Sequence, residues 1–447
     1  MYTSRAFSSR AIAPANSKYW TTYKTGPDGQ RQTVLMDMSH VPAEDLDFPV
    51  LFPGMDASNH DHSAKVDWTF DPGRFSLACT EGVTAGQEVY NNYGPKGNDE
   101  LLLGYGFCIP DNPFDTVMLT LKPPPEELQQ TLRETHSGYF AQDGTWSGDK
   151  ATFRLRKMPA PETFTGITSA FDHLPEGLLD LLTQIVRFDR GLRFQRVENP
   201  AAYLKEPESH GRRYLPFVAR MIVTSLAPKY QKLQATSATL STEPQNALQA
   251  QSKIYRDAQI EILEGTINGL RASLRILRPP YAENARLVTL DEAVALMDES
   301  ITKDFLAGIR ANARTSDIEQ LRLAGWEEDA WVLLLCYAWL WTSSNPTEEM
   351  IKLHIDELEA EYNAESLITQ SSGSVQGEAS GEAGDLMTIV KTAAERLPES
   401  PWADKGWSER LIAGFGGRVL KNESFMMMVP SEEGGEEPRL VVYLHGK

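Results

Sequence analysis

The sequence predicts an α+β protein with a β-rich N-terminal part, a mainly helical middle and a small α/β segment at the end. Three observations in its 447 residues support this prediction. Short alternating runs rich in Val, Thr and aromatic residues fill the part up to residue 122. After Pro123-Pro124-Pro125, apolar residues recur at helical spacing. A Ser/Gly-rich stretch at 371–382 then precedes two further apolar runs.

Turn residues divide the N-terminal part into predicted hairpins. The segment from Lys24 to Gln30 contains Gly, Pro and Asp and joins two runs of Thr, Tyr and Val. Asp71-Pro72-Gly73 is a second hairpin signal. The strands predicted from residue 47 onward lie at 65–70, 74–79, 88–93 and 116–121. A tight turn follows at 94–98, and Asn98 is placed to cap a short helix.

The pattern beyond residue 125 is helical. Its apolar period predicts helices at 174–188, 212–226, 245–276, 326–341, 348–362 and 386–397. Thr289-Leu290-Asp291-Glu292 has the sequence of a capping box at the start of a further helix. The apolar run Leu333 to Trp341 is too short to span a membrane and predicts a buried helix. The runs 425–430 and 439–444 are predicted to pair as strands.

Charge and cysteine content restrict the classes of partner. The net charge is −19, which argues against nucleic acid as the main partner and favours basic proteins, although acidity more commonly serves only solubility. Cys79, Cys108 and Cys336 are far apart, which excludes a disulfide framework and fits an intracellular compartment, cytoplasmic or nuclear. The acid-free segment from Met1 to Trp20 is also typical of a transit peptide, so organelle import stays open. The oligomeric state is not indicated.

Two motifs of polar and aromatic residues stand out. The first is Asp56-Ala57-Ser58-Asn59-His60. The second begins at Tyr93-Gly94, continues through Asn98-Asp99-Glu100-Leu101-Leu102 and ends at Tyr105-Gly106-Phe107. The two Tyr-Gly pairs flank a strand–turn–helix unit, which can direct two phenol groups into one cavity.

This ordered set resembles the C-terminal half of a SET domain. The resemblance is closest to the subfamily of the Rubisco large-subunit lysine methyltransferase and its ribosomal and actin-directed relatives, and it covers residues 47–115. Ser4-Arg5-Ala6-Phe7 also resembles a segment that precedes the first motif in that subfamily. The implied domains are a partial SET domain at 1–122 with an insertion at about 19–46, a helical substrate-binding-like domain at 123–365, a flexible linker at 366–384 and a C-terminal segment at 385–447 without assigned function.

The resemblance implies an S-adenosyl-L-methionine-dependent protein-lysine N-methyltransferase acting on a non-histone protein. It assigns catalysis to Tyr93, whose hydroxyl would orient the lysine amine. The residues that it assigns to the cofactor are Asn59, His60, Phe107 and Arg5. Those that it assigns to the substrate lysine are Tyr105, Asp56 and Trp68. In this family the final segment threads under the preceding loop, so we expect Asn59 and Tyr93 to lie close together and to face one cleft.

Two alternatives stay open at the level of sequence. The glycine-rich first half of a SET domain is expected before Ser4, so the chain is either an N-terminally incomplete enzyme or a catalytically inactive remnant that serves as a protein-interaction module. A metallohydrolase built on Asp56, His60, Asp61 and His62 is a minor alternative. Metal sites normally recruit ligands from later segments as well, and no second cluster of this kind is visible.

Overall fold

The computed structural model describes residues 6–8, 19–25, 27, 30–37, 49–52, 54, 56–71, 74–164, 166–192, 199–206, 210–239, 243–278, 287–313, 315–344, 379–431 and 434–444. The chain forms two compact units. Unit 1 comprises Met1–Thr116 and Leu233–Glu261, and unit 2 comprises Val117–Lys232 and Ile262–Lys447. Helices and antiparallel sheets both occur, in agreement with the predicted α+β class. The predicted helix at 348–362 lies outside the described residues.

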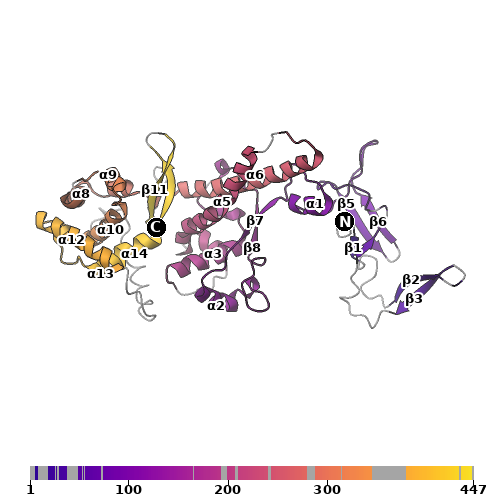
Figure 1. Ribbon diagram of the computed structural model, residues 1–447, viewed down its shortest axis with the longest axis horizontal. Coiled ribbons are helices and arrows are strands. Elements are labelled where there is room, and N and C mark those ends of the chain that lie inside the picture. Colours follow the sequence, from indigo (N-terminus) through magenta and orange to yellow (C-terminus); the bar gives the residue numbers. More distant parts are fainter. Residues whose placement is uncertain are drawn as a thin grey trace. The chain divides into compact units, whose positions relative to one another are not determined.

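In its described residues, unit 1 contains three antiparallel strand pairs (Figure 1). These pairs are β1 (Ala6–Ser8) with β4 (Pro49–Leu51), β2 (Tyr19–Thr25) with β3 (Arg31–Asp37), and β5 (Val66–Asp71) with β6 (Arg74–Cys79). The two predicted hairpin turns are confirmed, because Thr25 pairs with Arg31 and Asp71 pairs with Arg74. The first pair joins the segment after Arg5 to the strand that leads into the Asn59-His60 motif.

The strand predicted at 88–93 does not form. Among the described residues, its backbone makes a single isolated parallel bridge, between His60 and Asn91. The partner is a loop that changes direction after Asp61, so no second rung can follow. Val89 accordingly has no sheet face to cover and is 47% exposed.

Unit 2 is mainly helical, as predicted, with β7 (Thr116–Thr120) and β8 (Thr152–Arg156) paired at its start. The helices of the described chain are α1 (Asn98–Tyr105) in unit 1, and then α2 (Glu126–Thr135), α3 (Glu176–Asp189), α4 (Pro200–Lys205), α5 (Leu215–Thr239), α6 (Ala247–Arg275), α7 (Leu290–Ala295), α8 (Glu299–Ala313), α9 (Ile318–Leu323), α10 (Glu327–Ser344), α12 (Ala379–Arg396), α13 (Glu409–Leu411) and α14 (Gly417–Glu423). Short helical turns occur at Ser137–Tyr139, Pro161–Thr163, Ser169–His173, His210–Tyr214, Pro401–Ala403 and Ile412–Gly416. The last seven residues of α5 and the first half of α6 belong to unit 1.

Helix α10 lies in the core of unit 2. It contains the apolar run at 333–341 that the sequence predicted to be a buried helix. Trp331 and Tyr337 of this helix are fully buried, as is Trp402, and the Tyr337 and Trp402 ring centroids lie 5.3 Å apart. The prediction of a buried helix is therefore confirmed. Within the described residues, no helix is long and apolar enough to cross a membrane.

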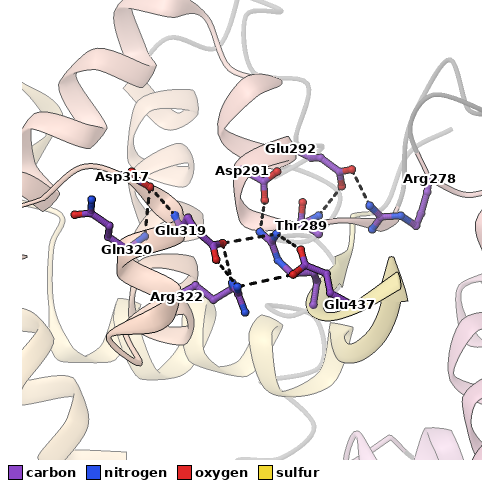
Figure 2. A network of polar contacts seen from close by, with 10 residues as sticks. Arg278, Thr289, Asp291, Glu292, Asp317, Glu319, Gln320, Arg322 and Glu437 are labelled. Carbon is purple, nitrogen blue, oxygen red and sulfur yellow. Dashed lines mark hydrogen bonds and ion pairs between the residues drawn. The ribbon is translucent and has the colours of Figure 1, made fainter. Parts of the chain in front are cut away.

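The C-terminal strands pair as predicted and are joined to the helices by ion pairs. β10 (Ser424–Pro430) is antiparallel to β11 (Glu436–Tyr443), and β9 (Leu287–Val288) pairs with the other edge of β11. In the network of Figure 2, Arg439 of β11 donates to Asp291 of α7 at 2.7 Å. The Glu292 carboxylate accepts the Thr289 backbone N–H at 2.8 Å, as a capping box requires. α12 begins at Ala379, inside the stretch predicted as a linker.

Candidate active site

The two sequence motifs meet through their backbones. The Asn91 N–H donates to the Asn59 carbonyl at 2.8 Å, and the Asp61 N–H donates to the Asn91 carbonyl at 2.9 Å. The Asn92 amide reinforces this contact by donating to the carbonyls of His62 at 3.1 Å and Ala64 at 3.2 Å. Residues 59–61 and 91–93 are thus fixed side by side, although about thirty positions separate them in the sequence.

Tyr93 is held at both ends by the Asn59-His60 segment. Its backbone N–H donates to Nδ1 of His60 at 3.1 Å, and its phenol hydroxyl donates to the Ser58 carbonyl at 2.7 Å. The Tyr93 and His60 rings stack with centroids 4.9 Å apart and planes 13° apart. The position of the phenol oxygen is therefore set by the first motif rather than by rotation of its own side chain.

Two more rings extend this stack. The Tyr105 ring stacks on the Tyr93 ring, with the two ring centroids 4.8 Å apart. Phe107 meets Tyr105 edge-on at 6.2 Å and lies 6.5 Å from His60. We call His60, Tyr93, Tyr105 and Phe107 the four-ring cluster. It brings together predicted cofactor, catalytic and substrate residues from three short segments of unit 1.

The glycines of the two Tyr-Gly pairs have a backbone conformation that other residues rarely adopt. Gly94 has φ 91° and Gly106 has φ 83°. Gly106 ends α1, and its N–H donates to the carbonyls of Leu101 and Leu102 at 3.0 and 3.1 Å. Each glycine thus turns the chain sharply directly after a tyrosine, and both tyrosines reach the same cluster.

Asn98 anchors the start of α1, but it is not the predicted cap. Gly97 occupies the cap position, and the Asn98 side chain is fully buried. Its amide donates to the Ile109 carbonyl at 2.9 Å and to Asp115 at 2.8 Å, while its oxygen accepts the Ile109 N–H at 2.7 Å. Burial raises the pKa of Asp115, and the hydrogen bonds from Asn98 oppose that rise. The prediction failed because a partner seventeen residues later captures the side chain.

His60 is a neutral imidazole in this arrangement. Burial is the main cause that lowers its pKa below the usual value. Its Nδ1 accepts a hydrogen bond, so the ring proton resides on Nε2. Within the described residues, Nε2 of His60 and Oδ1 of Asn91 are buried without a hydrogen-bond partner. The site therefore contains one buried donor and one buried acceptor that the described chain leaves unsatisfied.

The remaining predicted site residues lie around this cluster. The Asn59 backbone lies beside residue 91, but its exposed side-chain amide donates to Glu88 at 2.6 Å. Asp56 is half-buried in a turn at the start of the first motif. Trp68 is half-buried in β5, opposite Leu77. Arg5 lies outside the described residues.

A metal centre on the His60 and His62 segment finds no support. Among the described residues, no group of three or more His, Cys, Asp or Glu side chains is arranged to hold a metal ion. Nδ1 of His60 is already used by Tyr93, and Asp61 accepts hydrogen bonds from the Ser63 N–H and hydroxyl, each at 2.7 Å. The Ser63 bonds lower the pKa of Asp61, as expected for a turn-forming Asp.

Sequence reasoning missed residues that position the site without belonging to its motifs. The Ser58 carbonyl receives the Tyr93 hydroxyl, and Gln251 of α6 accepts the Cys108 N–H just after Phe107. Gln259, two turns further along α6, donates to the Thr116 carbonyl at 2.8 Å. Any residue type can supply a backbone carbonyl, and the two glutamines lie more than 140 positions from their partners, so no local signal marks either contact.

Several protein-lysine methyltransferases are similar to this chain in sequence. Ribosomal lysine N-methyltransferase set10 of Schizosaccharomyces pombe is 29% identical over 296 residues, which are 64% of this chain and 51% of that protein. The chain is similar to protein-lysine N-methyltransferases of the SET class. Ribosomal lysine N-methyltransferase 1 of Saccharomyces cerevisiae is 44% identical over 86 residues, 19% of this chain and 15% of that protein. N-lysine methyltransferase SETD6 of Homo sapiens is 32% identical over 98 residues, 20% of each chain.

These methyltransferase similarities have two limits. No family model matches the chain. The aligned part spans about half the length of set10 and a smaller share of the other two relatives. The similarity therefore identifies the class of the relatives, and the activity of the present protein is a matter for proposal.

Proposed function

We propose that this protein is an S-adenosyl-L-methionine-dependent protein-lysine N-methyltransferase of the SET class, in the Rubisco large-subunit methyltransferase-like subfamily, and that it acts on a non-histone protein. The observation that supports this most strongly is the four-ring cluster, in which Tyr93 is fixed against the Asn59-His60 segment by two hydrogen bonds. The similarity to named lysine methyltransferases supports the same reaction.

The chemical properties of the cluster suit the cofactor's adenine end. A neutral Nε2–H of His60 and the Oδ1 of Asn91 offer a donor and an acceptor in a buried place, and Phe107 offers an aromatic face. We assign cofactor holding to His60 and Phe107, together with Asn59 and Arg5. Asn59 would exchange its present bond to Glu88 for the cofactor. When bound, the cofactor supplies a methyl group on a cationic sulfur.

The substrate amine must reach that methyl group uncharged and correctly aligned. The aromatic walls formed by Tyr93 and Tyr105 disfavour the ammonium form, because low polarity lowers the pKa of an amine. The Tyr93 hydroxyl already donates to the Ser58 carbonyl, so it acts on the substrate as an acceptor for an amine N–H. That bond would direct the nitrogen lone pair at the methyl carbon, so that the N–C bond forms as the C–S bond breaks with its electron pair going to sulfur. The methylated ammonium would then release one proton to water. Asp56 and Trp68 complete the proposed lysine channel.

We propose a ribosomal protein as the substrate. Two of the relatives reported above are named for ribosomal lysines. Ribosomal proteins are generally basic, and this chain carries a net charge of −19, which favours encounter with a basic partner.

The test compares Tyr93→Phe with Tyr139→Phe in a radiolabelled methyl-transfer assay on ribosomal proteins. Both changes remove a hydroxyl that donates to a backbone carbonyl, from Tyr93 to Ser58 and from Tyr139 to Gly177. Tyr93→Phe should lower transfer about 100-fold or more, because the amine loses its alignment. Tyr139→Phe should retain it.

Two results would contradict the proposal. If Tyr93→Phe transferred methyl groups as fast as the wild type, the proposed mechanism would be rejected. Calorimetric titration that detects no S-adenosyl-L-methionine binding by the folded protein would instead favour the interaction-module alternative.

A further inference from the structure

A cavity of about 460 Å³ lies within unit 2, away from the methyl-transfer motifs in sequence. It is lined by the end of α3, the first turns of α5, and the junction between α14 and β10. This volume falls in the range of small-molecule sites. Nothing in the proposed methyl-transfer reaction uses it.

One wall of the cavity is rigid and electrically neutral. Arg190 and Glu423 form a buried ion pair at 2.8 Å, and a second guanidinium nitrogen reaches the same carboxylate at 3.0 Å. The Arg190 guanidinium also lies 4.4 Å from the centroid of the Phe217 ring and 5.0 Å from that of Tyr214. Arg190 is thus committed to the protein, and its charge is balanced there.

Two further cations line the cavity on exposed residues and form no such ion pair. Within the described residues, no carboxylate pairs with Arg220 of α5 or Lys421 of α14. The Arg220 guanidinium lies over the Phe425 ring at 5.8 Å, a contact that leaves its N–H groups available. Apart from the Arg190–Glu423 pair, the cavity lining thus carries two cations against one carboxylate, that of Asp189, in a chain whose net charge is −19.

Uncharged polar side chains accompany these cations. The side chains of Thr224, Asn422 and Ser424 line the same cavity and have no hydrogen-bond partner among the described residues. The hydroxyl and amide groups can all donate. Buried Val186 and Phe217 supply an apolar surface beside them. The cavity therefore combines a donor-rich cationic side with an apolar side.

We propose that this cavity binds a phosphate monoester attached to an apolar organic body. A phosphate monoester carries a charge of about −1.5 to −2 at neutral pH and three strong acceptor oxygens. Its charge is attracted by both Arg220 and Lys421 and exceeds the single opposing charge of Asp189, which the charge of a carboxylate would not. Its oxygens suit the surrounding donors, and the organic body would lie on Val186 and Phe217.

Asp189 makes the proposal sharply testable. It also lines the cavity, and burial raises the pKa of its carboxyl group. Its negative charge opposes an anionic ligand and would attract a cationic one. Asp189→Asn keeps the shape and removes the charge, so the sign of its effect reports the charge of the ligand.

The experiment is calorimetric titration of the full chain with phenyl phosphate, inorganic phosphate and benzoate. We expect phenyl phosphate to bind most tightly. Arg220→Gln and Lys421→Gln should each weaken it about tenfold through loss of a charge-assisted bond. Asp189→Asn should tighten it severalfold. Lys391→Gln removes an exposed lysine of α12 outside the cavity and should leave binding unchanged.

Each opposite result would overturn the proposal. Absence of phenyl phosphate binding would show that the cavity is not a site for this class. Benzoate binding of equal strength would remove the preference for phosphate. Equal weakening by Lys391→Gln would reveal general charge attraction, and weakening by Asp189→Asn would indicate a cationic ligand. Thermal melts of every variant show whether it is folded, and a loss of affinity is interpreted only for folded variants.

Discussion

At the residue scale, the buried amide of Asn98 holds the start of α1 against the segment at 109–115. Asn98→Ala would leave Ile109 and the Asp115 carboxylate without these partners. Buried groups left unsatisfied cost about 1–3 kcal/mol each. We therefore expect the free energy of unfolding of unit 1 to fall by about 3 kcal/mol, measured by urea denaturation.

Asn98→Asp is the matched variant, since it keeps the shape and sets a second carboxylate against Asp115. Like charges in a buried site repel, so this variant should be more destabilised at pH 7 than at pH 4. A loss below 1 kcal/mol for Asn98→Ala would show that the site relaxes around the missing amide.

A second residue-scale prediction concerns Glu327, at the start of α10. One of its carboxylate oxygens is buried without a hydrogen-bond partner among the described residues, and burial raises its pKa above the ordinary Glu value. The folded state then binds more protons than the unfolded state between the ordinary and the raised pKa. Glu327 therefore makes stability fall as pH rises through that window. The stability of Glu327→Gln relative to wild type should rise between pH 4 and pH 7.

The neighbouring Glu328 is exposed and serves as the control. Urea denaturation of Glu327→Gln and Glu328→Gln at both pH values measures the difference. A Glu327→Gln variant whose relative stability falls with increasing pH would mean that the pairing of Glu327 with Arg439 and Arg322 outweighs its burial.

The sequence was enough to identify residues of the site, but it was not enough to predict the structural role of each one. Tyr93, Tyr105 and Phe107 were identified from their motif, and the structure gathers them into one cluster with His60. The role of Asn98 could not be predicted, because an Asn at the start of a helix can serve either as a cap or as a buried hydrogen-bonding bridge. Only the return of the chain at Asp115 separates the two roles, and that is a tertiary contact.

At the scale of elements, one glycine sets how closely α8 packs. A Cβ on Gly308 would lie 2.1 to 2.6 Å from the Trp402 indole, whereas a Cβ on Gly265 of α6 would meet nothing within 4 Å. Gly308→Ala should therefore lower the free energy of unfolding by about 1–3 kcal/mol through overpacking. Gly265→Ala should raise it by about 0.5–1 kcal/mol, because alanine favours a helix. Paired urea denaturation curves test both, and equal effects would refute the close packing.

Helices and strands that form from patterns within their own segment were predicted from the sequence. Strands that depend on a partner far away in the sequence were not. The hairpin β5–β6 closes through its own turn, and α6 follows its own apolar period, so both were found from sequence. β9 has only two residues, and its partner β11 lies about 150 positions later, so no local pattern indicates it. The strand predicted at 88–93 had the right composition, but its partner in the described part of the chain is a loop.

At the scale of the whole molecule, the net charge of −19 should govern encounter with a basic substrate. This prediction depends on the proposed function. The Debye length falls from about 10 Å at 0.1 M salt to about 3 Å at 1 M, which screens charges on separate molecules more than contacts inside the aromatic cluster. KM for a basic ribosomal protein should therefore rise steeply with salt, while kcat changes little. A short uncharged peptide around the target lysine is the control, and its KM should respond weakly. If both substrates responded equally, salt would be acting on the site itself, and the acidic surface would have no role in recognition.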